Sequence, residues 1–153
     1  MMDQTSERFS AATKEMLGEA GWIPDRDVSR EIQLPPGFDP FPAALKALAE
    51  FGNLHVGRRG SGVEFARTPI VLDPMLAMGE DDRFREFSGI LKSNLYPLGE
   101  TDDGHGFVAI DEQGRVFLIY DDLNFVGETF DSALENLLAG AKRPRLVDEG
   151  GRW

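Results

Sequence analysis

The sequence contains no cysteine and only 2 histidines among its 153 residues. Without cysteine the chain has no thiol nucleophile and no cysteine ligand for zinc or an iron–sulfur cluster. No apolar run is close to the length of about 20 residues that a membrane-spanning helix needs. The N-terminus also lacks the basic start and apolar stretch of a secretory signal. We therefore expect a soluble cytoplasmic protein that carries no cofactor and no metal.

Positive charge is scarce in the middle of the chain. Residues 80–135 hold 14 of the 27 Asp and Glu but only 4 of the 16 Lys and Arg, so −10 of the net charge of −11 lies there. Binding to nucleic acid or anionic lipid requires a cationic surface, and we expect this chain to bind neither. A negative block attracts basic proteins and speeds their encounter. Solubility alone is the alternative explanation for such acidity.

Four segments have the apolar spacing of amphipathic helices. They cover residues 6–20, 39–51, 80–93 and 129–140. Ser6, Asp39 and Thr129 are the expected N-caps of three of these helices. Gly21 and Gly140 stand where glycine commonly ends a helix.

Runs with strand character separate these helices. They cover residues 54–56, 63–65, 68–74, 96–98, 107–110 and 116–120. The glycine-rich residues 57–62 predict a hairpin between the first two runs, and residues 111–115 predict a hairpin between the last two. Hairpins without alternating helices favour an α+β fold, an antiparallel sheet with helices mainly on one face. We expect one domain over residues 1–140 and a basic, flexible tail over residues 141–153.

One loop resembles a catalytic site at first sight. Glu100, Asp102, Asp103 and His105 lie within six residues of each other, bounded by glycines. A small acid–base or metal-dependent hydrolase centred on His105 is therefore one hypothesis. Paired carboxylates catalyse proton transfer only when burial separates their pKa values, and this loop is predicted to be an exposed turn. His55, the other histidine, is expected on the solvent side of its strand, so we predict no catalytic or metal-binding residues.

The acidic residues instead mark four successive connections of the predicted sheet. They are Glu100, Asp102, Asp103, Asp111, Glu112, Asp121, Asp122 and Glu128, with Asp131 beside the last. Alternate connections of an antiparallel meander lie at the same edge of the sheet. We therefore expect several of these groups to merge into a negative patch that binds a basic protein and takes the place of a phosphate backbone.

Several short motifs, in order, resemble the third immunity-protein subgroup of the SUKH superfamily. The first helix is followed by Gly21, Trp22, Pro24 and Arg26, and the second helix ends in Phe-Gly-Asn-Leu at residues 51–54. Residues 95–100, 110–117 and 127–140 resemble the later motifs of the family. Each motif is common by itself, but the ordered set over residues 9–140 is specific.

This resemblance implies an α+β domain and a bacterial immunity protein of a polymorphic toxin system. Such a protein neutralises the toxin encoded beside it by direct binding, and the family has no catalytic residues to transfer. The toxins are often nucleases or deaminases, which tend to be basic because they act on nucleic acid. We expect a monomer or weak homo-oligomer. A regulatory scaffold that binds a partner other than a toxin is the remaining alternative.

Overall fold

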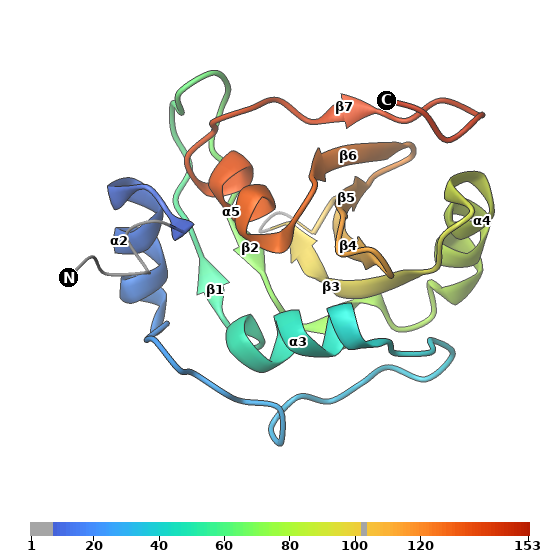
Figure 1. Ribbon diagram of the computed structural model, residues 1–153, viewed down its shortest axis with the longest axis horizontal. Helices are drawn as coiled ribbons and strands as arrows, with labels where there is room; N and C mark the ends of the chain where they lie inside the picture. Colours follow the sequence, from blue (N-terminus) through green and yellow to red (C-terminus); the bar gives the residue numbers. More distant parts are fainter. Residues whose placement is uncertain (1–7, 102–103) are drawn as a thin grey trace.

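The computed structural model describes residues 8–101 and 104–153. Seven strands of these residues form one antiparallel sheet whose order follows the chain from β1 to β7 (Figure 1), which confirms the predicted α+β class. The elements are α2 (Ala11–Ala20), α3 (Pro42–Phe51), β1 (His55–Val56), β2 (Ile70–Val71), η1 (Pro74–Ala77), α4 (Asp81–Leu91), β3 (Leu95–Thr101), β4 (Phe107–Asp111), β5 (Val116–Ile119), β6 (Leu123–Gly127), α5 (Phe130–Leu138) and β7 (Arg145–Leu146). No helix in the described residues has the length and apolar character that a membrane crossing requires.

Both faces of the central strands are buried. Alternate residues of a strand point to opposite faces of its sheet. All four residues of β5 are buried. Val116 and Leu118 join the cluster formed with α2, α3 and α5. Phe117 and Ile119 join a second cluster that contains Phe84 and Phe87 of α4. Of the described α-helices, α2, α3 and α5 therefore cover one face of the sheet and α4 covers the other.

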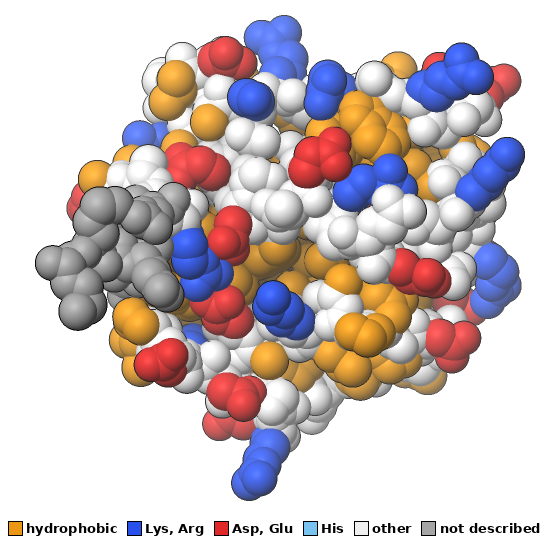
Figure 2. All heavy atoms as spheres, in the orientation of Figure 1, with side chains coloured by type: hydrophobic (Ala, Val, Ile, Leu, Met, Phe, Trp, Pro, Cys, Tyr) orange, Lys and Arg blue, Asp and Glu red, His pale blue; other side chains and the backbone are white. Residues whose placement is uncertain are grey.

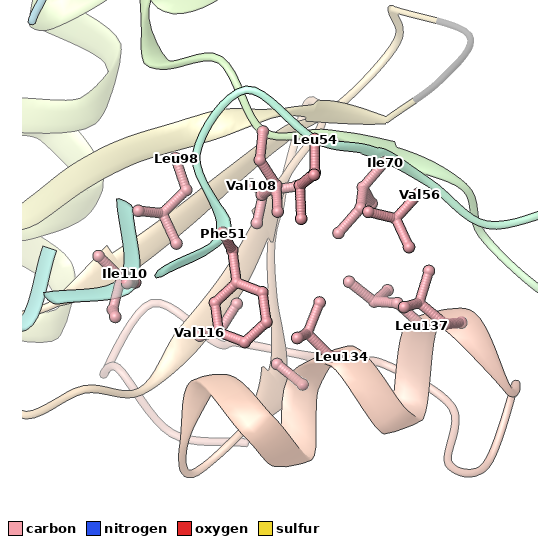
Figure 3. Packing of buried hydrophobic residues seen from close by; sticks show 14 of the residues in the cluster. Phe51, Leu54, Val56, Ile70, Leu98, Val108, Ile110, Val116, Leu134 and Leu137 are labelled. Atoms are coloured by element: carbon pink, nitrogen blue, oxygen red, sulfur yellow. The ribbon is translucent and has the colours of Figure 1, made fainter. Parts of the chain in front are cut away.

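Figure 3 shows the larger of the two clusters from close by. Phe51 at the end of α3 and Leu134 of α5 point toward side chains of the sheet, among them Leu98 and Val108. Phe51 also lies 4.9 Å from Phe130 at the start of α5, measured between ring centroids. This packing fixes the two helices relative to each other, and it positions the surface between them.

The helix ends follow local chemistry. Thr129 caps α5 as predicted, and with Ser132 it forms a reciprocal capping box. Ser6, the predicted cap of the first helix, lies outside the described residues, and the described helix α2 begins after Ser10, whose side chain accepts a hydrogen bond from the amide of Thr13. The cap predicted for the second helix is wrong, because α3 begins after Phe41. Pro42 fixes φ in the first turn of α3, where a missing N–H costs nothing. Asp39 therefore does not cap this helix.

The first predicted hairpin is wrong. β1 pairs with β2 rather than with residues 63–65. The amides of Val63 and Glu64 instead donate to the carbonyls of Ala139 and Gly140, at 3.0 and 2.8 Å. The last carbonyls of a helix have no partner within it, and this loop supplies donors to the end of α5.

The segment after Gly140 differs from the expected flexible tail. Residues 145–146 form β7, which pairs with Asn124 and Phe125 of β6. Val147 is buried, and the ring of Trp153 stacks on that of Phe125 with 4.6 Å between centroids. The basic charge of the segment predicted a solvated tail, but its apolar residues cover the second cluster.

Tyr96 offers a test of the core. Its side chain is fully buried against Phe38 and Phe41, and its hydroxyl has no hydrogen-bond partner among the described residues. We expect Tyr96→Phe to leave the free energy of unfolding at pH 7 unchanged or to raise it by up to about 1 kcal/mol, because a buried hydroxyl without a partner is destabilising. Urea denaturation measures this effect.

The same substitution should change the response to alkaline pH. Burial raises the pKa of the Tyr96 phenol, so above about pH 10 the unfolded chain loses a proton that the folded chain keeps. Stability then falls as pH rises, and Tyr96→Phe should make that fall shallower. A loss of more than about 1 kcal/mol in the variant at pH 7 would show that the hydroxyl has a partner in solution.

Candidate functional site

The four acidic connections separate into two pairs at opposite ends of the sheet. The register of β3 to β6 places the β3–β4 and β5–β6 loops at one end, which we call the β3–β4 end. The β4–β5 turn and the β6–α5 junction lie at the other, which we call the β4–β5 end. The antiparallel meander thus brings alternate groups together, as expected, and keeps the two pairs apart.

The β3–β4 end has the denser set of predicted residues. Asp121 and Asp122 are exposed and Glu100 is partly exposed, whereas Asp102 and Asp103 lie outside the described residues. The two loops touch, because a Cβ placed on Gly106 would come within 2.5 Å of the Tyr120 ring. Asp121 has a cation nearby, with Arg83 at 3.9 Å.

Among the described residues, the two histidines are not part of a metal site. His55 is exposed on β1, as predicted, and His105 is exposed on the β3–β4 loop. Within residues 8–101 and 104–153, no three His, Asp or Glu side chains are arranged to hold a metal ion. The described residues therefore provide no metal site for the hydrolase hypothesis.

Asp111, at the β4–β5 end, is not part of an exposed surface. Its side chain is 0% exposed, and one carboxylate oxygen accepts hydrogen bonds from the amides of Gln113 and Arg115 at 3.0 and 2.9 Å. The other accepts from Arg115 Nε at 2.7 Å. The carboxylate therefore shapes the β4–β5 turn, and the expectation that it faces a partner needs this correction. Glu112 and Glu128 are exposed as predicted.

The β4–β5 end also contains a hollow that no sequence pattern predicted. It lies between α3, the β4–β5 turn and the start of α5, has a volume of about 560 Å³, and we call it the α3–α5 hollow. Figure 2 shows apolar side chains at the centre of this face with charged ones around them. The hollow is lined by Arg8, Ala43, Lys46, Ala47, Glu50, Phe51, Ile110, Gln113, Gly114, Glu128, Thr129, Phe130 and Asp131.

Arg8 forms one wall of this hollow and joins α3 to α5. Its guanidinium donates two hydrogen bonds to Glu50, at 2.9 and 3.1 Å, and two to Asp131, at 2.8 and 2.9 Å. It also lies over the ring of Phe9, 5.0 Å from the centroid. Hydrogen bonding to Asp131, and then to Glu50, holds the pKa of Arg8 above its ordinary value. No local signal in the sequence connects positions 8, 50 and 131, so only the fold reveals the cluster.

Comparison with known proteins agrees with the ordered motifs. We find no match to this chain among the curated proteins or among the solved structures. A family model described as SUKH-3 immunity protein matches residues 9–140, which include every described helix and all strands but β7. The chain therefore belongs to the SUKH-3 immunity protein family, whose description implies a role in immunity to a toxin.

Proposed function

We propose that this protein neutralises a basic bacterial toxin, a nuclease or a deaminase, by binding it in the cytoplasm without catalysis. The observation that carries the proposal is the family match over residues 9–140. The net charge of −11 supports the basic character of the partner. An enzyme that acts on nucleic acid needs a cationic surface for its substrate, and an acidic protein complements that surface.

Neutralisation would follow from occupation of the toxin's substrate-binding surface. The carboxylates of the immunity protein take the positions that substrate phosphates would take. We assign two roles to the two acidic ends. Asp121 and Asp122, exposed on the β3–β4 end, attract the toxin over a distance, and the β4–β5 end makes the closer contact.

Co-expression tests the proposal directly. The toxin encoded beside this chain should kill cells when expressed alone, and it should be tolerated when this protein is present. A complex of the two should elute as one species in gel filtration. Cell death despite co-expression, or separate elution of the two proteins, would show that this toxin is not the partner.

Charge reversal at the β3–β4 end should slow association. In an Asp121→Lys/Asp122→Lys variant we expect the association rate constant to fall roughly 3- to 10-fold at low ionic strength, with the dissociation rate within about 2-fold of wild type. Long-range attraction acts before contact and salt screens it, so the association rate of the variant should also vary less with added salt. Stopped-flow measurements across a salt series give both rates.

A Glu15→Lys/Glu19→Lys variant is the matched control. Both residues are exposed on α2 with side-chain exposures of 64% and 52%, and α2 lies on the opposite side of the molecule from α4 (Figure 1). The two variants change the net charge equally. Equal slowing in both would assign the attraction to the whole protein rather than to the β3–β4 end, and unchanged association in both would remove electrostatic steering from the proposal.

A further inference from the structure

We propose that the α3–α5 hollow is a pocket for one long cationic side chain of the toxin, an arginine or a lysine. This inference rests on the proposed function and deepens it, because it names the kind of group that the β4–β5 end would bind. The hollow has three properties that fit such a side chain, and they are its apolar floor, its excess of carboxylates and its neighbouring guanidinium site.

The floor of the hollow suits the apolar stem of a long side chain. Ala47, Phe51 and Ile110 are 7%, 2% and 2% exposed, so they form a fixed surface packed on the core. Phe130 adds a partly exposed ring. Arginine and lysine bury their methylene groups along apolar surface and keep the charged head at its edge. A short or strongly polar side chain would leave this floor uncovered.

The charges around the hollow favour a positive head. Arg8 forms ion pairs with two carboxylates, those of Glu50 and Asp131. The three side chains together therefore carry a net charge of −1. Glu128 also lines the hollow, is exposed and forms no ion pair with the described residues. Lys46 is the second cation that lines the hollow. The lining therefore contains three carboxylates and two cations. An acidic side chain would meet the carboxylate excess and would be repelled.

Arg8 shows that this part of the surface can hold a guanidinium. Its head is bound by two carboxylates and lies over aromatic rings, with the centroids of Phe51 and Trp22 each at 5.9 Å. Paired hydrogen bonds to carboxylates and stacking on aromatic faces are the contacts that arginine makes at protein interfaces. Glu128 and the ring of Phe130 offer the same two kinds of contact to a second cation inside the hollow.

Two pairs of variants test the pocket with a catalytically inactive form of the toxin encoded beside this chain. Glu128→Lys reverses the charge inside the hollow, and Glu19→Lys makes the same change at an exposed residue of α2 that does not line it. Ala43→Phe fills the hollow from α3, and Leu45→Phe enlarges an exposed residue of that helix that does not line it. Thermal unfolding of each variant confirms that it is folded.

We expect Glu128→Lys and Ala43→Phe each to raise Kd at least 10-fold, mainly through faster dissociation, because both remove contacts made only in the complex. The two controls should stay within about 3-fold of wild type. Equal effects of the two lysine substitutions, or wild-type binding by folded Ala43→Phe, would overturn the pocket while the proposed function stands. Failure of the wild-type protein to bind the toxin would overturn the proposed function and the pocket with it.

Discussion

Replacement of Asp111 by alanine is expected to lower the free energy of unfolding by about 3–5 kcal/mol. The carboxylate is fully buried and forms an ion pair with Arg115, whose side chain is only 19% exposed. Removal of the carboxylate would leave that guanidinium without its partner and would leave the amides of Gln113 and Arg115 without an acceptor. Loss of one member of a buried charge pair is costly because the other charge stays out of water. Urea denaturation at pH 7 measures the loss.

Glu112→Ala is the matched control, because the residue is next in the same turn but exposed. It should change the free energy of unfolding by no more than about 0.5 kcal/mol. The two substitutions remove the same charge, so a difference between them reports the buried ion pair and hydrogen bonds of Asp111 rather than the loss of charge itself. If Asp111→Ala cost less than about 1 kcal/mol and weakened toxin binding, Asp111 would belong to the binding surface after all.

The helices and central strands could be predicted because their signals are local. The apolar spacing of residues 80–93 and 129–140 led to α4 and α5, and the continuous run at residues 116–120 led to β5, which is buried on both faces. β6 was not predicted, since Asn124 interrupts the apolar pattern of a short strand. Sequence patterns of this kind report which residues turn inward, and they do so best in long, regular elements.

The wrong hairpin arose from contacts that are distant in the sequence. Residues 57–65 have the glycines and the apolar ends of a hairpin, but the carbonyls at the end of α5, some 75 residues away, bind their amides. Gly62 accommodates this contact, since a Cβ there would lie 2.6 Å from the carbonyl oxygen of Ala139. The same glycine therefore fits both a turn and a close backbone approach, and the sequence does not distinguish them.

The candidate site was predictable only in part for a related reason. The sequence shows where carboxylates occur in the loops, and it correctly predicted that Glu112, Asp121, Asp122 and Glu128 are exposed. It does not separate Asp111 from Glu112, although one is fully buried and the other exposed. The α3–α5 hollow is built from an arginine before α2, one face of α3, a turn and the start of α5. Such a surface exists only when these segments are packed together.

A chain that ends at Gly140 is expected to lose at least about 3 kcal/mol of its free energy of unfolding. It would lack β7, the buried Val147 and the ring of Trp153. That ring stacks on Phe125 and lies 5.7 Å from Phe117, measured between centroids. Both phenylalanines belong to the second core cluster, so their exposure to water is costly in proportion to the apolar area uncovered.

A full-length variant with Lys142→Gln and Arg143→Gln separates charge from packing. Both side chains are exposed, so this variant should unfold within about 0.5 kcal/mol of wild type, and Trp153→Ala alone should reproduce a large part of the loss seen on truncation. Tryptophan fluorescence during urea unfolding reports on the same ring, because only Trp22 and Trp153 contribute to the signal.

If the truncated chain were as stable as the full chain, the segment would be a solvated tail, as its charge alone predicts. A large loss would extend the cooperative domain beyond residue 140, the last position of the family match, and would make the C-terminal segment part of the sheet that supports the α3–α5 hollow.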